Sequence, residues 1–190
     1  MGTRLRKLYP VVTALLLTVG NSLPLAAQST DDASRIDDLL AALRGAEAAE
    51  ATRISRDIER AWSQSGSTSL DMLLRRGREA MEEEDLDAAI EHLTAVTDHA
   101  PDFAEGWHAR ATAYYMKGLY GPALDDLQKA LILNPDNYNA LFGLGVMLQE
   151  FGDLRRAEQA FSQVLDLHPN HENATKAQEQ LQSRGIGRTL

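Results

Sequence analysis

Two histidines near the carboxyl end have the residue type and spacing that most readily suggest metal chemistry. His168 and His171 flank a Pro-Asn dipeptide. Imidazole nitrogens are common zinc ligands, but a zinc site needs at least three protein ligands. Only Glu172 follows within helical reach, and "HPNH" has the composition of an exposed turn. We therefore predict no metal site here and no other cofactor.

Three further patterns could carry chemistry, and each lacks a necessary part. Gly143-Leu144-Gly145 could begin a phosphate loop, but a dinucleotide-binding loop needs a third glycine and a preceding strand. The acidic run "EEED" ending at Asp85 does not have the spacing of a calcium loop. No serine, histidine and acid group together, although such triads need not be close in sequence. We predict no catalytic residues and a protein that is not an enzyme.

The composition is that of one folded helical domain. A chain of 190 residues has the length of a single ordinary domain. Its 44% hydrophobic residues can bury a core, and its 25% charged residues are typical of a folded soluble protein. Abundant alanine and only 6% aromatic residues favour closely packed helices over a β-sandwich. Cysteine is absent, which excludes disulfides and thiol nucleophiles.

The first 27 residues have the layout of a secretory signal peptide. Three basic residues lie within the first seven positions, an apolar run follows from Leu8 to Val19, and small residues allow cleavage after Ala27. The apolar run is shorter than the roughly 20 residues that a permanent membrane helix needs. We predict export to the periplasm of a Gram-negative bacterium; an uncleaved inner-membrane anchor is the alternative.

Cleavage after Ala27 would leave a strongly acidic chain. Residues 1–27 contain three basic and no acidic residues, so 16 basic and 28 acidic residues remain, a net charge of −12. Nucleic acids and anionic lipids are bound by basic surfaces. We therefore expect no nucleic-acid partner, and no stable membrane insertion unless the signal sequence is uncleaved.

The chain between residues 70 and 171 repeats with a period of 34 residues. Pro101, Pro135 and Pro169 mark the period. Five more classes of residue recur at the same interval, namely Ala89, Ala123 and Ala157; Leu93, Leu127 and Phe161; Val96, Ala130 and Val164; Gly77, Ala111 and Gly145; and Leu73, Trp107 and Leu141. Each copy contains two stretches with helical periodicity. A single helix pair leaves one apolar face uncovered, so the copies must stack to form a continuous core.

Residues 70–171 resemble the tetratricopeptide repeat (TPR) family. The second copy, "AEGWHARATAYYMKGLYGPALDDLQKALILNPDN", has a nearly complete TPR pattern and departs from it at Arg110, where the family usually has leucine. The third copy has Leu148 in place of tyrosine. The first copy is weaker, with Leu73 for tryptophan, Ala80 for tyrosine and Glu84 for glycine. The resemblance implies an all-α fold, a right-handed α-solenoid of antiparallel helix pairs.

The segments outside the three copies complete the predicted solenoid. Residues 31–63 read as an antiparallel helical hairpin; this hairpin is either a degenerate repeat, which we favour, or an independent cap. Residues 172–183 read as a capping helix with Ala174, Ala177 and Leu181 facing inward. The predicted organisation is signal peptide 1–27, hairpin 31–63, linker 64–69, repeats 70–103, 104–137 and 138–171, capping helix 172–183 and tail 184–190.

The resemblance also predicts where a partner binds, because in this family the first helix of each pair lines a concave groove. Mixed apolar and polar side chains on that face suit an extended or helical peptide. The alternative is that the N-terminal hairpin covers several of these residues and makes them core. The predicted groove residues are Leu74, Arg78 and Met81 from the first copy, His108, Thr112, Tyr115 and Met116 from the second, and Asn139, Phe142, Val146 and Gln149 from the third.

One subtype of the family grips a C-terminal carboxylate with lysines, an arginine and asparagines. The corresponding positions here hold Leu74, Arg78, Ala109, Asn139 and Gly143. Of these, only Arg78 and Asn139 could contribute. We therefore do not expect a carboxylate clamp.

These observations predict a non-catalytic scaffold or adaptor of the cell envelope that binds a peptide or helix of a partner protein. The alternative is an accessory or regulatory subunit of an envelope enzyme or biogenesis system. A third hypothesis is a hydrolase whose catalytic groups are not recognisable in the sequence. The identity of the partner and the oligomeric state are left open.

Overall fold

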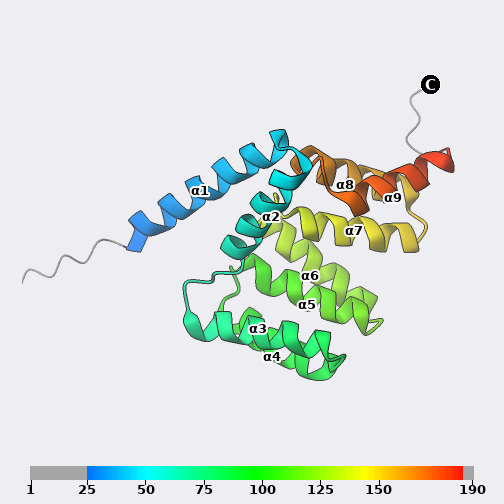
Figure 1. The fold of residues 1–190 in the computed structure, drawn as a ribbon. Coiled ribbons are helices and arrows are strands. Elements are labelled where there is room, and N and C mark those ends of the chain that lie inside the picture. Colours follow the sequence, from blue (N-terminus) through cyan, green and yellow to red (C-terminus); the bar gives the residue numbers. More distant parts are fainter. Residues whose placement is uncertain (1–24, 186–190) are drawn as a thin grey trace, which may run out of the picture.

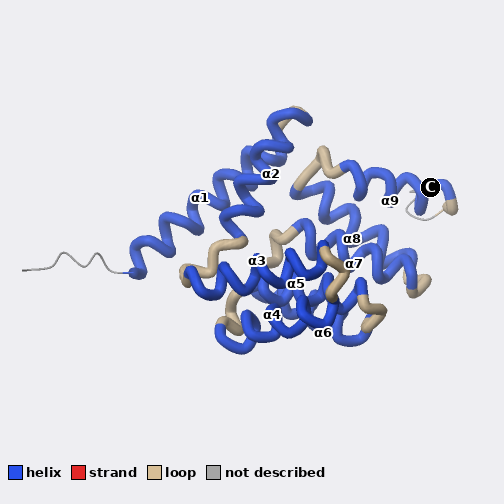
Figure 2. Tube along the Cα trace, turned by 60° about the horizontal axis from the view of Figure 1, so that its bottom comes forward, coloured by secondary structure: helices blue, strands red, loops and turns tan. Residues whose placement is uncertain are grey.

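The computed structural model of the protein describes residues 25–185, and this range forms nine helices and no strand (Figures 1 and 2). The predicted all-α fold is confirmed. The basic start and apolar run of the predicted signal peptide lie outside the described residues. Within the described range, no helix combines the length and the apolarity needed to cross a membrane.

Three antiparallel helix pairs stack in chain order and form the body of the molecule (Figure 1). Each pair is interrupted by a short turn at the break that the 34-residue period contains. The pairs are α3 (Thr68–Glu82) with α4 (Leu86–His99), α5 (Ala104–Met116) with α6 (Tyr120–Leu133), and α7 (Tyr138–Glu150) with α8 (Leu154–Leu167).

Small residues on the first helix of a pair make room for a large residue on the second. A Cβ atom at Gly77 would lie 2.5 Å from Cγ of Leu93, and a Cβ at Gly145 would lie 2.5 Å from Cε1 of Phe161. Real side chains do not approach that closely, so glycine is required for the two helices to pack. The close approach predicted from the recurring small residues is confirmed.

The turns within the pairs follow the same period, with one exception. Gly118 and Gly152 have φ angles of 76° and 80°, which glycine adopts without steric conflict. The equivalent position of the first pair is Glu84, with a φ angle of 60°. A side chain in this left-handed region is strained by about 1–2 kcal/mol. The weaker match of the first copy therefore has a structural consequence at this turn.

The unusual Arg110 is part of a buried polar joint between the first and second pairs. Its guanidinium donates two hydrogen bonds to Asp126, at 2.7 and 2.9 Å, and a third to Oγ1 of Thr97 at 2.7 Å. The Arg110 and Asp126 side chains are 12% and 7% exposed. The hydrogen bond from Asp126 raises the pKa of Arg110 further above its ordinary value, and burial opposes this shift. The residue that replaces the usual leucine therefore links α4, α5 and α6.

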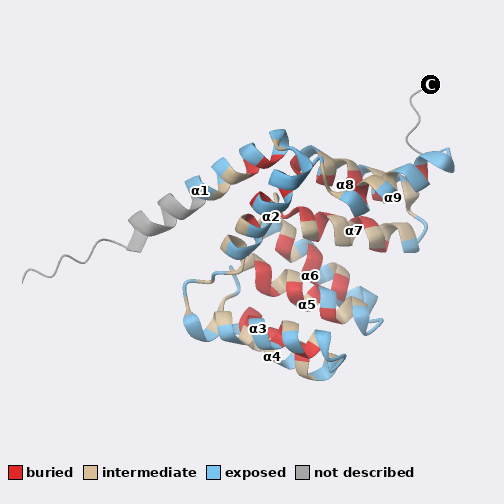
Figure 3. Cartoon of the chain, in the orientation of Figure 1, coloured by how far each residue is buried: buried red, intermediate tan, exposed pale blue. Residues whose placement is uncertain are grey.

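The N-terminal hairpin consists of α1 (Leu25–Gly45) and α2 (Ala48–Trp62), and its position differs from our expectation. A degenerate repeat in series would stack on α3 and α4. Instead, the buried face of the hairpin shares a core with the third pair and the capping helix (Figures 1 and 3). This core contains Leu40, Leu43, Ala51, Ile54 and Ile58 of the hairpin, together with Tyr138, Leu141, Val164, Leu167 and Ala174.

Helix α2 consequently runs across the stack, beside the beginning of α7 (Figure 1). The rings of Trp62 and Tyr138 lie 5.1 Å apart, and the Tyr138 hydroxyl donates a hydrogen bond of 3.3 Å to the carbonyl of Ser55. Asn170 donates a hydrogen bond of 2.8 Å to the carbonyl of Ala46. The hairpin is therefore a docked side element rather than a further turn of the solenoid.

The carboxyl end of the stack is covered by α9 (Glu172–Ser183). Ala174 and Leu181 are fully buried, and Lys176 on the opposite face is exposed. The predicted capping helix and its inward face are confirmed.

Candidate functional site

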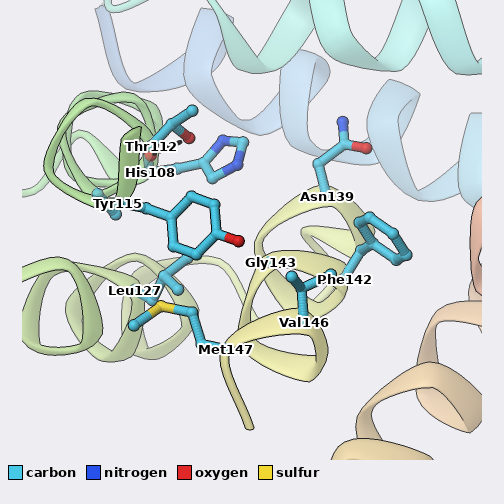
Figure 4. A pocket seen from close by; sticks show the side chains of 10 residues that line it. His108, Thr112, Tyr115, Leu127, Asn139, Phe142, Gly143, Val146 and Met147 are labelled. Carbon is cyan, nitrogen blue, oxygen red and sulfur yellow. Dashed lines mark hydrogen bonds between the residues drawn. The ribbon is translucent and has the colours of Figure 1, made fainter. Parts of the chain in front are cut away.

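A pocket of about 260 Å³ lies between the first helices of the second and third pairs, α5 and α7 (Figure 4). Most of its lining is apolar, with two hydroxyls, an imidazole and an amide among the lining groups. The lining residues are His108, Ala111, Thr112 and Tyr115 of α5, Leu127 of α6, and Asn139, Phe142, Gly143, Val146 and Met147 of α7.

Six of the predicted groove residues meet in this pocket. Helical spacing explains the grouping, since residues three or four positions apart lie on one face of a helix. The six are His108, Thr112 and Tyr115 on α5, and Asn139, Phe142 and Val146 on α7.

The predicted contribution of the first pair to the groove is not found as expected. Leu74 is only 1% exposed and packs in a core cluster with Leu93 and Ala109, so its place in the open groove is wrong. Met81 is half-buried against the same cluster. The apolar face of α3 is therefore used for packing on α4 and α5.

Two other predicted residues lie outside the pocket. Met116 is 47% exposed but does not line it, because α5 ends at this residue. Gln149 is half-buried near the end of α7 and is also absent from the lining. The pocket is consequently shorter along the helices than the predicted groove.

Four residues that line the pocket were not predicted, because only groove-facing positions on the first helix of each pair were expected to contribute. Leu127 belongs to a second helix, yet it reaches the pocket because Gly143 has no side chain. A Cβ at Gly143 would lie 3.6 Å from Cδ2 of Leu127, which is an ordinary contact. The close spacing of Gly143 and Gly145 was the available signal. Ala111 and Met147 complete the missed set.

Glu105, the second residue of α5, holds three elements together below one end of the pocket. It is 7% exposed, accepts a hydrogen bond from Arg78 of α3, and lies 3.3 Å from Nδ1 of His108. Asn137, before α7, donates to it at 3.3 Å. Burial alone would raise the pKa of Glu105, but His108 and Arg78 outweigh burial and hold the pKa below its usual value. This carboxylate is ionised and fully partnered.

A second, polar pocket of about 530 Å³ adjoins the first and is walled by α2 of the hairpin. His108 and Asn139 line both pockets, so the two form one continuous surface. The other lining residues are Arg56, Glu59, Arg60, Trp62 and Ser63 of the hairpin segment, Arg78 of α3 and Glu105 of α5.

The two residues that could have contributed to a carboxylate clamp are already bonded within the protein. Arg78 binds Glu105 and also donates 3.0 Å to the hydroxyl of Ser63. Asn139 donates 3.1 Å to Glu59 of α2. These contacts agree with the expectation that the family's clamp is not built here.

At the other end of the pocket, the lining residue Tyr115 is followed by two exposed aromatic rings that lie outside the pocket. The Tyr115 ring lies 5.8 Å from that of Tyr120, which lies 5.7 Å from that of Phe151. The Tyr115 hydroxyl donates 2.6 Å to Glu150, and this hydrogen bond raises the pKa of Tyr115 to about 12. The phenol therefore stays protonated at neutral pH and serves as a hydrogen-bond donor rather than a base.

The other chemical patterns of the sequence do not form a catalytic or metal site in the described part of the chain. Gly143 and Gly145 are inside α7 and not in a loop at its start. His168 and His171 lie at the joint between the third pair and α9, with ring centroids 5.4 Å apart. In residues 25–185, no group of three or more histidine, cysteine or acidic side chains could hold a metal ion.

Comparison with known sequences agrees with the helical pairs just described. Two sequence profiles described as tetratricopeptide repeat match the chain, one over residues 74–132 and one over residues 115–181. The chain belongs to the tetratricopeptide repeat family. Together, the two TPR matches cover all three helix pairs except the first turns of α3.

Several TPR proteins resemble this chain along much of their length. A TPR repeat-containing protein of Rhizobium etli is 28% identical over 160 residues, which are 84% of this chain and 78% of the relative. The first TPR domain of Spaghetti (RPAP3) superposes with a TM-score of 0.58 at 24% identity, covering 60% of this chain and 91% of that one. The Sgt2 TPR domain of Aspergillus fumigatus gives 0.58 at 22% identity, covering 62% and 80%. The structural matches establish the shared fold.

Proposed function

We propose that this TPR protein is a non-catalytic scaffold that binds a peptide or helix of a partner protein in the pocket between α5 and α7. The observation that carries the proposal is the open, mainly apolar pocket with a few polar groups at its edges. Such a lining buries apolar side chains of a ligand, while hydroxyl, imidazole and amide groups orient its backbone.

A structural relative supports this use of the fold. The Spaghetti TPR domain was solved bound to an HSP90 peptide, SRMEEVD. The relatives do not identify the partner of the present chain. They support a protein or peptide as its ligand.

We place this scaffold in the periplasm, exported by a cleavable signal peptide. The basic start, the apolar run and the small residues before Gln28 support this location. The test is to determine the first residue of the protein purified from its native envelope. Gln28 as the first residue is expected, whereas an intact amino terminus in the membrane fraction would favour the anchored alternative.

Affinity capture from envelope extract tests the binding pocket. Tyr115→Ala and Phe142→Ala remove two rings that line it, whereas Phe151→Ala removes an exposed ring outside it. We expect the two pocket variants to lose the partner and the Phe151→Ala variant to retain it. Retention of every partner by folded Tyr115→Ala and Phe142→Ala variants would refute the proposal.

The Phe142→Ala variant needs a check on folding, because the Phe142 ring also lies 5.6 Å from the Phe161 ring and 5.1 Å from that of His171. Val146→Glu is a second pocket variant, which places a charge on a half-buried lining position without removing a ring. Circular dichroism compares the folds. Capture of one stoichiometric partner would favour an accessory subunit, and capture of several weak partners would favour an adaptor.

A further inference from the structure

The polar pocket beside α2 offers a second contact to any segment bound between α5 and α7. His108 and Asn139 form the boundary that the two pockets share. A peptide anchored by an apolar side chain near Phe142 therefore continues past these residues toward α2. The side chains of the polar pocket therefore determine which peptide residues are favoured next to the apolar anchor residue.

The two acidic groups of the polar pocket differ in how far the protein itself occupies them. Glu105 is buried and bonded to Arg78 and Asn137. Glu59 is exposed and accepts a hydrogen bond of 3.1 Å from Asn139. With Arg78 paired to Glu105, the charges left at this pocket are those of Arg56 and Arg60 against that of Glu59.

The two arginines that α2 contributes to the polar pocket have no strong partner within the described part of the chain. Arg56 and Arg60 lie one helical turn apart, are exposed, and both line the polar pocket. Arg56 has no ion-pair partner within the described part of the chain. Among the described side chains, Arg60 pairs only with Asp57, in an i,i+3 contact of 2.9 Å whose side chains are 69% and 35% exposed. Exposed pairs of this kind contribute little and exchange readily, so both guanidinium groups are available.

We propose that Arg56 and Arg60 bind acidic side chains of the partner segment, adjacent to the apolar residue that occupies the α5–α7 pocket. This inference rests on the proposed function and adds the chemistry of the partner. A guanidinium donates paired hydrogen bonds in the geometry that a carboxylate accepts. Because both arginines belong to the docked hairpin and not to a repeat, the hairpin supplies charge selectivity while the repeats supply the apolar anchor site.

Selection from a displayed library of random 12-residue peptides, each held between flanking linkers, tests the inference on the purified full chain. We expect the selected peptides to combine an aliphatic or aromatic residue with neighbouring aspartate or glutamate. An Arg56→Glu/Arg60→Glu variant is expected to select lysine or arginine in place of the acids. The control Arg53→Glu/Arg155→Glu makes the same change of net charge at exposed positions outside both pockets, and it should select acidic peptides.

Affinities of a selected peptide, synthesised with acetylated and amidated ends, give the quantitative test. The Arg56→Glu/Arg60→Glu variant should bind it roughly tenfold more weakly or worse, which corresponds to the loss of a charge-assisted hydrogen bond. Apolar selection without acids would overturn the arginine contact and leave the proposed function standing. Selection of no peptide at all would overturn both. A requirement for a free C-terminal carboxylate would overturn the assignment to acidic side chains.

Discussion

The three repeats and the N-terminal hairpin are attached to the molecule by different kinds of contact. The two helices of a repeat are packed through residues that recur every 34 positions, such as Gly145 beneath Phe161, and Arg110, which is bonded to Asp126 in its own repeat, also donates to Thr97 of the preceding repeat. The hairpin docks through contacts that do not follow the repeat. Two of its hydrogen bonds join residues that are 83 and 124 positions apart in the sequence. Periodic packing produces the stack, and the aperiodic docking places α2 beside its pocket.

The largest loss of stability should follow from removing Asp126, which holds the arginine that contacts the preceding repeat. Asp126→Ala leaves the guanidinium of Arg110 buried without its partner, which should lower the free energy of unfolding by about 3–5 kcal/mol. Urea unfolding followed by circular dichroism measures the change. The double variant Arg110→Leu/Asp126→Leu should recover most of it, and a loss below about 1 kcal/mol in Asp126→Ala would show that the joint is not structural.

A cavity created in the hairpin should destabilise the docked hairpin without destabilising the first two repeats. Ile58 is fully buried against the third repeat, so Ile58→Ala should destabilise the hairpin docking by about 2–5 kcal/mol. Hydrogen exchange should then lose protection in α1 and α2, while α3 to α6 keep theirs. Equal loss of protection in all helices would mean that the hairpin and the repeats fold as one unit.

Gly143 and Gly145 of α7 have different roles. Gly145 allows close packing on α8, whereas Gly143 lines the pocket. Gly145→Ala should lower the free energy of unfolding by about 1–3 kcal/mol, because the new Cβ collides with the Phe161 ring. Gly143→Ala meets only ordinary contacts with Leu127 and should be neutral or stabilising by up to about 1 kcal/mol. Thermal melts compare the two variants. A Gly145→Ala variant as stable as Gly143→Ala would contradict the close packing of α7 and α8.

The smallest effect concerns pH at the hairpin side of the third repeat. Burial lowers the pKa of His168, and the neighbouring His171 lowers it further. Burial also lowers the pKa of His171, against the opposing charge of Glu59 and a backbone hydrogen bond. Nδ1 of His171 accepts the backbone N–H of Ala174 at 3.1 Å, so protonation removes the cap of α9.

Because both pKa values are lower in the folded protein, the unfolded chain binds more protons below its own pKa of about 6.5. The free energy of unfolding should therefore be constant above that pH and decrease as pH falls through the folded pKa values. Glu105 acts in the same direction, but only below its ordinary pKa of 4.5. Urea unfolding at pH 5 to 8 should show the slope, and His171→Asn, which keeps a capping acceptor, should reduce it. An unchanged slope in His171→Asn would rule out this source.

The sequence predicted the features that follow the 34-residue repeat. The helix pairs, the small residues at their contacts and the six side chains that meet between α5 and α7 all follow from positions within a repeat. Leu74 was misplaced because its position in the repeat does not reveal that α3 uses this face to pack on α5. Leu127 was missed because its access depends on Gly143 in another repeat.

The docking of the hairpin had no sequence signal of this kind. Its apolar stripe predicted a buried face but not which surface would cover it, since Tyr138 lies far from Ile54 and Ile58 along the chain. The polar pocket formed by Arg56 and Arg60 against α5 and α7 therefore emerges only in the folded molecule. A segment that does not follow the repeat pattern can pack on any surface that fits its apolar face.

Site-specific photo-crosslinking in cells tests the binding pocket most directly. A photoreactive phenylalanine analogue at Val146 faces the pocket, whereas the same analogue at Gln163 lies exposed on α8. The proposed function predicts a covalent adduct with a partner protein from position 146 and none from position 163. An adduct from position 163 without one from position 146 would place the partner on the other face and contradict the account.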